Sequence, residues 1–352
     1  MTRPLRIALL LATPGSTWGG MEKHTLELAR GLSESGHEVH VLADADYREP
    51  FMDVSHFHPA PVQYSRRHPW LGLRLRRLLR RIQPDICHAQ GNKAAQLLSN
   101  VKRRRGTTES MYVGTLHGTK SSHRAFARLD GVIAVSDDIA ESLEHPNKTV
   151  IFNGISTLPL SATTAFEPPT ERPLVVAAGR LEPVKGFDRL LRAWSQEVGH
   201  GQLVILGEGS ARGKLEKQVK QLGLEDRATL PGYETNVRAW LKQADLCIIS
   251  SDREGFPYIL VEALLSECPI ISTPVSGVST WLPEGCIAAS LSTDDLAACL
   301  SSALADLPAL RETLAPTFAR AAESLTCDAM VRRTVAFYEH LAAATPDSDE
   351  AR

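Results

Sequence analysis

The sequence contains no long apolar run and no dinucleotide-binding fingerprint, and each absence disfavours a class of protein. No uninterrupted apolar stretch approaches the roughly 18 to 20 residues that a membrane-spanning helix needs. The N-terminal residues show no small-residue cleavage site after an apolar core, so we expect no signal peptide. The pattern Gly-x-Gly-x-x-Gly is also missing, which disfavours a nicotinamide-dependent dehydrogenase.

Paired cysteines are missing as well. The six cysteines are scattered, and no Cys-x-x-Cys pair occurs. Most of them stand in apolar surroundings, which is typical of buried thiols in a reducing cytoplasm. We therefore expect a cytoplasmic protein.

Charge is distributed unevenly along the chain. Residues 1–160 hold 21 lysines and arginines against 15 aspartates and glutamates, whereas the remaining residues hold 18 against 26. This asymmetry predicts that the first half faces something anionic. The overall balance, 43% apolar and 23% charged in 352 residues, is typical of a globular protein long enough for two domains.

Short apolar runs alternate with helix-like segments throughout the chain. Many runs are almost continuously apolar, as expected of parallel strands that are covered on both faces. The predicted strands are 5–12, 38–43, 85–90, 111–117, 132–136 and 149–153 in the first half, and 174–179, 202–207, 228–232, 246–251, 269–273 and 286–290 in the second. This alternation predicts an α/β protein with two Rossmann-like, doubly wound domains.

A stretch rich in proline, threonine and serine separates the two halves. It divides the chain into a first domain at 1–157, a linker at 158–173 and a second domain at 174–329. In doubly wound sheets ligands bind beyond the carboxyl ends of the strands. We therefore expect the ligand in a central cleft that the two domains face.

Arg180 and Lys185 stand in a loop after the strand that ends at Gly179. Two cations at the mouth of a sheet can hold a diphosphate, arginine through two parallel hydrogen bonds and lysine as a point charge. Each contact is worth on the order of 4 kcal/mol at an effective dielectric constant near 20. The pair would stabilise a nucleoside diphosphate leaving group without Mg²⁺. The alternative is a pair of surface cations that bind Glu182 and Asp188.

The segment from Glu254 to Glu262 places two carboxylates beside a predicted helix start. Pro257 suits the first helical position, so Glu254 lies in the loop and Glu262 about one and a half turns into the helix. Gly255 allows close approach of the backbone to a ligand, and free N–H groups at a helix start bind anions. The carboxylates can accept hydrogen bonds from sugar hydroxyls. The alternative, a solvated helix face, explains Glu262 poorly because apolar residues flank it.

Two further loops follow predicted strands at the same edge. They carry Gly207 in Leu-Gly-Glu-Gly and Tyr233 in Pro-Gly-Tyr. Their backbones could hold a nucleobase, but ordinary strand–helix turns explain them equally well.

In this order the motifs resemble the family 4 retaining glycosyltransferases of the GT-B fold, of the type that builds bacterial lipopolysaccharide and surface glycans. They are Gly-Arg-Leu-x3-Lys-Gly, Leu-Gly-Glu-Gly, Pro-Gly-Tyr and Glu-Gly-Phe-Pro-x4-Glu-Ala, within 179–263. The resemblance implies that Arg180 and Lys185 bind the donor diphosphate and that Glu262 binds the ribose. It implies that Glu254 binds donor-sugar hydroxyls, helped by the backbone of Gly255, Phe256 and Pro257. It also implies that a helix at about 330–344 packs back on the first domain.

In the first half, the resemblance points to Gly19, Gly20 and His117. In the family a Gly-Gly-x-Glu loop closes over the donor phosphates, and backbone amides at a helix start can bind phosphate; a flexible turn is the alternative. His117 ends a predicted strand and is similar to a histidine that contacts the donor sugar, although a lone histidine is more often structural.

The resemblance implies transfer of a hexose with retention of configuration from a nucleotide diphosphate-sugar, with a UDP-sugar favoured, to a glycan or glycolipid. We expect no metal, since Arg180 and Lys185 supply the charge, and we discount Asp44-Ala45-Asp46 as a chance match to the metal-binding Asp-x-Asp motif. A nucleotide-sugar epimerase or hydrolase of the same fold, and a non-catalytic glycan-binding protein, remain alternatives.

Two basic segments, 70–82 and 102–105, suggest a peripheral contact with the anionic cytoplasmic face of the inner membrane. Leu71, Leu75, Leu78, Leu79 and Ile82 would form an apolar face. The alternative is a helix packed in the core with a solvated basic face. Nucleic-acid binding is disfavoured because no recognised module accompanies the basic runs.

Overall fold

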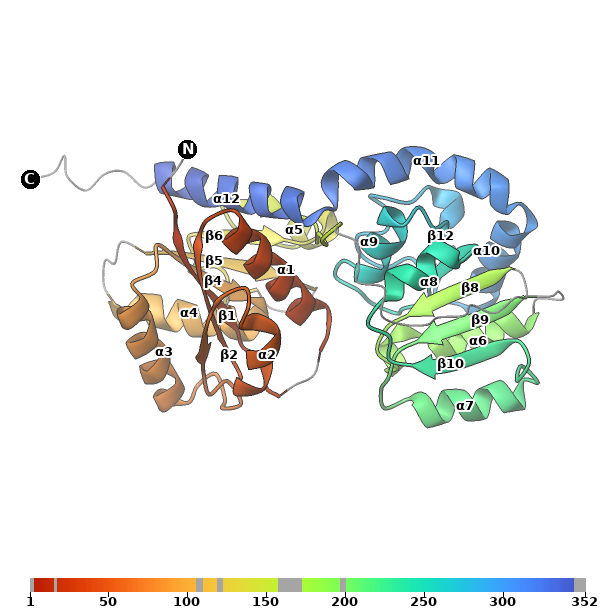
Figure 1. Ribbon diagram of the computed structural model, residues 1–352, viewed down its shortest axis with the longest axis horizontal. Coiled ribbons are helices and arrows are strands. Elements are labelled where there is room, and N and C mark those ends of the chain that lie inside the picture. Colours follow the sequence, from red (N-terminus) through yellow and green to blue (C-terminus); the bar gives the residue numbers. More distant parts are fainter. Residues whose placement is uncertain are drawn as a thin grey trace, which may run out of the picture. The chain divides into compact units, whose positions relative to one another are not determined.

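The computed structural model describes residues 3–15, 18–105, 110–118, 123–157, 173–196 and 201–344. The chain forms two compact units, one of residues Met1–Ser156 with Cys327–Arg352 and one of residues Thr157–Thr326 (Figure 1). Nearly all of the predicted linker, 158–172, lies outside the described residues. Among the described residues, none of the helices is long and apolar enough to cross a bilayer.

The first unit is built on a seven-stranded sheet in the order β3-β2-β1-β4-β5-β6-β7, with every pair parallel. The strands are β1 (Arg6–Leu11), β2 (Glu38–Ala43), β3 (His56–Pro59), β4 (Ile86–Gln90), β5 (Met111–Leu116), β6 (Gly131–Ala134) and β7 (Lys148–Val150). Helices alternate with them, which confirms the doubly wound prediction. The short edge strand β3 was not predicted.

The helices of the first unit include one from the far end of the chain. They are α1 (Gly20–Glu34), α2 (Arg48–Phe51), α3 (Pro69–Ile82), α4 (Gly91–Arg105), α5 (Asp137–Glu141) and α12 (Cys327–Ala344), with a short 3₁₀ helix at Ala45–Tyr47. Helix α12 packs against α1 (Figure 1). The approach is close, because a Cβ added to Gly31 would lie 2.5 Å from Cγ2 of Val331. Tyr338 and Leu341 complete the apolar core around Leu28.

The second unit contains a five-stranded parallel sheet in the order β10-β9-β8-β11-β12. The strands are β8 (Leu174–Ala178), β9 (Gln202–Leu206), β10 (Ala228–Gly232), β11 (Leu246–Ile249) and β12 (Ile270–Ser272). The helices are α6 (Phe187–Gln196), α7 (Arg212–Gln221), α8 (Val237–Gln243), α9 (Tyr258–Leu265), α10 (Thr293–Ala305) and α11 (Leu307–Ser324), with 3₁₀ helices at Pro183–Lys185 and Glu284–Cys286.

The predicted strand at 286–290 is wrong. Cys286 ends a 3₁₀ helix, and Ile287 makes only an isolated bridge to Ser272. The 3₁₀ helix Glu284–Cys286 takes up Cys286, the first residue of the predicted strand. The apolar residues here are buried in the unit without joining a ladder, since Cys286 and Ala288 are almost fully covered.

Candidate functional site

Lys185 and Glu254 form an ion pair at the carboxyl edge of the second sheet. The Lys185 Nζ and Glu254 Oε1 atoms lie 2.6 Å apart, and the Ser251 hydroxyl donates to the same oxygen, also over 2.6 Å. Both side chains are largely covered, with 22% of Lys185 and 14% of Glu254 exposed. One carboxylate oxygen is therefore held by a cation and a hydroxyl, while the carboxylate keeps further acceptor capacity.

The alternative pairing of the two cations with Glu182 and Asp188 is wrong for Lys185, which pairs with Glu254, whereas Arg180 does interact with Glu182 through its charge. Glu182 accepts hydrogen bonds from the backbone N–H and the hydroxyl of Ser210, which lower its pKa. Asp188 pairs with Arg192 one helical turn away. Arg180 is exposed, and its positive charge helps to lower the pKa of Glu182. It is thus available to an anionic ligand.

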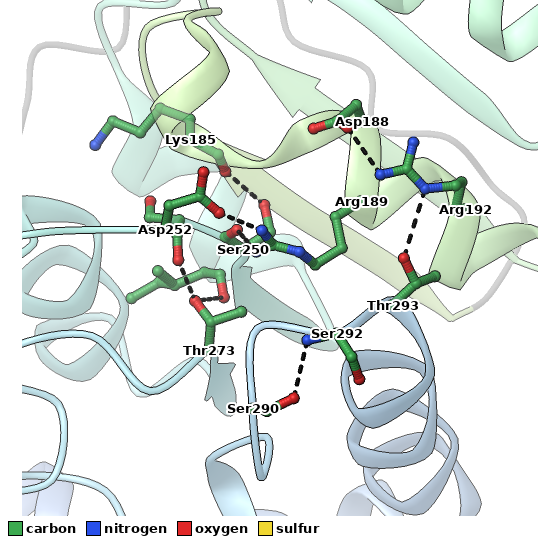
Figure 2. Close-up of polar contacts among 12 residues, drawn as sticks. Lys185, Asp188, Arg189, Arg192, Ser250, Asp252, Thr273, Ser290, Ser292 and Thr293 are labelled. Atoms are coloured by element: carbon green, nitrogen blue, oxygen red, sulfur yellow. Dashed lines mark hydrogen bonds and ion pairs between the residues drawn. The ribbon is translucent and has the colours of Figure 1, made fainter.

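A polar network outside the predicted site holds the Lys185 loop in place (Figure 2). The Ser250 hydroxyl donates to the Lys185 carbonyl over 2.9 Å, and the Arg189 guanidinium donates to the Ser250 carbonyl over 3.0 Å. Arg189 also pairs with Asp252, whose N–H donates to the Val184 carbonyl over 2.8 Å. Figure 2 shows the Lys185 ammonium pointing away from these contacts. The network fixes the backbone and leaves the charged end for the site.

Gly186 is required where this loop meets the strand end. Its φ is +62°, and a Cβ added there would lie 2.1 Å from the Ser250 carbonyl oxygen. A side chain would therefore separate the two segments that carry Lys185 and Ser251. The glycine in Lys-Gly is explained by this close backbone contact.

The loops after β8, β9 and β10 are connected through their backbones. Gly207 has φ +139°, and an added Cβ would lie 1.9 Å from the Gly179 carbonyl oxygen. The Gly207 N–H donates to the Gly232 carbonyl over 2.7 Å, and the Leu181 N–H donates to the Glu208 carbonyl over 2.8 Å. The N–H of Gly207 is therefore already used inside the unit. The Tyr233 ring at the same edge is 63% exposed.

The segment between the two glutamates differs from its prediction by one residue. Pro257 precedes the helix as an extended N-cap residue, and Tyr258 is the first residue of α9. Glu262 is 8% exposed and lies among buried residues of that helix, so the alternative of a solvated face is wrong for it. Phe256 is buried and Gly255 half-buried. Their backbones follow Glu254 in the loop that leads into α9.

His117 lies in the first unit, just after β5. Its Nε2 is 2.8 Å from Gln90 Oε1, and its ring meets that of His24 edge-on with centroids 4.6 Å apart. Burial holds the pKa of His117 well below its usual value, and the nearby His24 and His88 rings act in the same direction. The imidazole is therefore neutral near pH 7.

Gly19 and Gly20 begin helix α1 in the same unit. Gly19 is the extended N-cap residue, and its carbonyl accepts from the Lys23 N–H over 3.0 Å. The two residues before Trp18 lie outside the described residues. Asp44 accepts from the backbone N–H of Asp46 and caps a 3₁₀ helix. The predicted site residues are thus divided: His117, Gly19 and Gly20 belong to one unit, and the others belong to the second.

Comparison with known proteins yields matches over both units. Residues 18–157 match the family described as Glycosyltransferase Family 4, and residues 172–306 match the one described as Glycosyl transferases group 1. The chain is 25% identical to the lipopolysaccharide core biosynthesis glycosyltransferase LpsE of Rhizobium meliloti. The alignment covers 76% of this chain and 79% of LpsE. LpsD of the same organism, which carries the same description, is 26% identical. That alignment covers 85% of this chain and 88% of LpsD.

Solved structures match over almost the whole length. A glycosyltransferase from Rickettsia africae superposes with a TM-score of 0.80 at 14% identity, over 98% of this chain and 100% of that one. HepE of Anabaena, solved in complex with UDP and glucose, gives a TM-score of 0.77 at 17% identity. The superposition covers 96% of this chain and 100% of that one. At these identities the likeness establishes the fold, which is GT-B with two Rossmann-like domains.

Proposed function

Because the chain belongs to the family 4 glycosyltransferases of the GT-B fold, we propose that it transfers a hexose from a nucleoside diphosphate-sugar to a cell-surface glycan. The observation that carries the proposal is the Lys185–Glu254 pair, joined by Ser251 beside the exposed Arg180. One edge of the sheet thus carries two cations, which suit a diphosphate, and a carboxylate, which suits sugar hydroxyls. Relatives named as lipopolysaccharide core glycosyltransferases support a role in lipopolysaccharide or a related surface glycan.

Each residue has a distinct role in donor binding. Arg180 and Lys185 bind the diphosphate, and Lys185 also offsets the charge of Glu254, which would otherwise repel the phosphates. Glu254 accepts hydrogen bonds from the hydroxyls of the transferred sugar. The buried Glu262 binds the ribose, and the exposed Tyr233 ring covers the base. We favour a UDP-sugar, and the complex of HepE with UDP and glucose supports this choice.

The proposed reaction retains the anomeric configuration and uses neither a metal nor a protein nucleophile. The bond from the anomeric carbon to the phosphate oxygen breaks, and the acceptor oxygen bonds to that carbon on the same face. The departing phosphate oxygen takes the acceptor hydroxyl proton. The contacts of Glu254 with Lys185 and Ser251 support this route, because they reduce its nucleophilicity. Catalysis then comes from positioning and charge stabilisation.

The proposal predicts transfer without added metal. The protein is incubated with an acceptor glycan and with UDP-, GDP- and ADP-hexoses in turn, with excess EDTA, and product is followed by mass spectrometry and NMR. We expect one donor class to react at an EDTA-independent rate and to give the anomer of the donor. A rate restored only by Mn²⁺ would refute the metal-free route, and an inverted anomer would refute retention. Turnover of the donor without an acceptor would favour an epimerase or hydrolase. No turnover at all would favour a glycan-binding protein.

Helix α3 provides the candidate surface for a lipid-linked acceptor at the cytoplasmic face of a membrane. Its predicted apolar face is buried in the unit, so the idea that this face inserts into lipid is wrong. The exposed side is formed by arginines and by an aromatic end, where Tyr64 and Trp70 meet edge-on with centroids 5.5 Å apart. Trp70 is 48% exposed. Arginine with exposed tryptophan suits the interface of an anionic bilayer.

We expect charge reversal on α3 to weaken binding to anionic vesicles by tenfold or more, since each basic residue near such a surface contributes about 1 kcal/mol. The variant is Arg74→Glu with Arg77→Glu, both exposed. The control makes the same charge change at exposed Lys214 and Lys217 in the second unit. Co-sedimentation uses phosphatidylcholine vesicles with and without phosphatidylglycerol. Equal binding by both variants would exclude this surface.

A further inference from the structure

Edge strand β3 of the first unit carries two histidines beside a third one on β2. His56 lies opposite His40 in the parallel register, and His58 lies opposite Leu42, two residues further along. Side chains alternate between the two faces of a sheet, so all three histidines project from the same face. The ring centroids of His56 and His58 lie 5.0 Å and 5.1 Å from that of His40. These three residues are called the histidine cluster below.

Hydrogen bonds fix the protonation of two rings in the cluster. His40 Nε2 lies 2.9 Å from Glu38 Oε1, and since a carboxylate accepts, this nitrogen carries the proton. The other nitrogen of His40, Nδ1, therefore accepts from His58 Nε2 over 2.9 Å. Both rings are neutral in this arrangement. One added proton can enter on His58 Nδ1 without breaking either contact, but a second would place two N–H groups against each other.

The surroundings of the cluster oppose the uptake of protons. Burial is the main reason that the pKa values of His40 and His58 lie below their ordinary value. Positive charges act in the same direction, from Arg6 on β1 at His40 and from Arg81 on α3 at His58, as do the other histidines of the cluster. Glu38 opposes the shift at His40, but its second oxygen already accepts from Arg6 Nε over 2.8 Å.

Strand β3 is the part of the sheet that repulsion within the cluster can displace. It has four residues, lies at the edge of the sheet beside β2 and ends at Pro59. His56 is exposed, and the half-buried Phe57 stacks on Phe51 of α2. A short edge strand with few buried apolar contacts opens at a lower free-energy cost than the strands inside the sheet. Like charges on neighbouring strands lower that cost further.

We propose that the histidine cluster is a pH-sensitive latch, which holds β3 on the sheet while its rings are neutral and releases the strand when they are charged. A released histidine faces water and takes up a proton below about pH 6.5. Because the pKa values of His40 and His58 are lower in the closed form, the latch is closed above about pH 6.5 and opens as the pH falls below it. Strand β3 leads to α3 through residues 60–68, so its release would loosen that connection. The latch goes beyond the proposed function, and its test requires no activity.

The test is hydrogen exchange followed by mass spectrometry at two pH values on either side of the histidine pKa, about 7.5 and about 5.5. Rates are corrected for the intrinsic effect of pH on exchange. Amides of β4 report the acid response of the whole unit, which contains other buried histidines of lowered pKa, His24 and His88. In the wild type we expect β3 to lose about tenfold more protection than β4, since each proton taken up only on release favours opening by up to about tenfold per pH unit.

The variants remove the titrating rings and keep a hydrogen-bond donor. His58→Gln retains an N–H group for His40 Nδ1 and should reduce the excess loss at β3, and His40→Gln added to it should bring the excess below about twofold. The control His145→Gln removes a half-buried histidine whose ring contacts the Leu129 and Asn147 carbonyls, and it should keep the wild-type response. Melting curves at about pH 7.5 show whether each variant folds. Equal losses at β3 and β4 in the wild type, or a wild-type response in folded His58→Gln, would show that the latch is wrong.

Discussion

Arg180→Ala and Lys185→Ala should each lower kcat by about two to three orders of magnitude in a protein that remains folded. In the proposed reaction each variant removes a charge that would stabilise the departing diphosphate, and loss of a single preorganised group of this kind costs about 10²–10³ in rate. Lys185→Ala should have the larger effect. It also leaves Glu254, whose oxygen lies 2.6 Å from the ammonium, as an unpaired carboxylate beside the phosphates. Steady-state kinetics with the preferred donor measures both effects.

The controls for these variants make the same charge changes on the surface of the second unit. Arg192→Ala breaks an exposed pair with Asp188, and Lys220→Ala removes an exposed lysine of α7. Surface pairs contribute about 0–1 kcal/mol, so both controls should keep wild-type rates and melting temperatures. Wild-type kcat in both Arg180→Ala and Lys185→Ala would refute their role at the diphosphate. A loss shared with the controls would indicate a general effect of charge.

Gly207→Ala should destabilise the second unit by about 3 kcal/mol or more and lower its melting temperature by about 10 °C. The added Cβ would overlap the Gly179 carbonyl oxygen at 1.9 Å, and φ at this residue is +139°. The overlap is with backbone, so no side-chain rotation relieves it. Separation of the two loops would also move Arg180, which follows Gly179. Differential scanning calorimetry measures the unfolding of both units.

Gly213→Ala is the matched control, and we expect it to change stability in the opposite direction. Gly213 lies in the first turn of α7, and a Cβ added there meets nothing within 4 Å. Alanine at such a helical position should stabilise by up to about 1 kcal/mol. Equal melting temperatures for the two alanine variants would show that the loops at Gly207 are not held as closely as described.

The sequence predicts the sheet where apolar runs are long, and fails where pairing depends on distant partners. Strand β11, for example, is fully buried and reads clearly as a continuous apolar run. The edge strand β3 pairs only with β2 and contains two histidines and a proline, so no apolar run marks it. Within 286–290, Cys286 and Ala288 are buried apolar residues, and burial alone does not distinguish a loop from a strand.

At the site, motifs identify which residues matter but not how they contact each other. Lys185 and Glu254 are 69 positions apart, and only the fold brings them to 2.6 Å. Ser251 and Arg189 belong to no recognised motif, although both hold the Lys185–Glu254 region in place. The pair Ser250-Ser251 directly after an apolar run was the one available signal. On α3, the apolar residues are indicated by their spacing, but whether they face lipid or core depends on the rest of the unit.

The return of α12 to the first unit sets the order of events on the ribosome. Residues 157–326 form one continuous stretch, so the second unit has all its strands before α12 is synthesised. Tyr338 and Leu341 are needed to close the core over Leu28 in the first unit. Domains made on the ribosome usually complete folding in the order in which they emerge. Here the unit that emerges first completes its core last, and a chaperone would meet its uncovered α1 face throughout synthesis of the second.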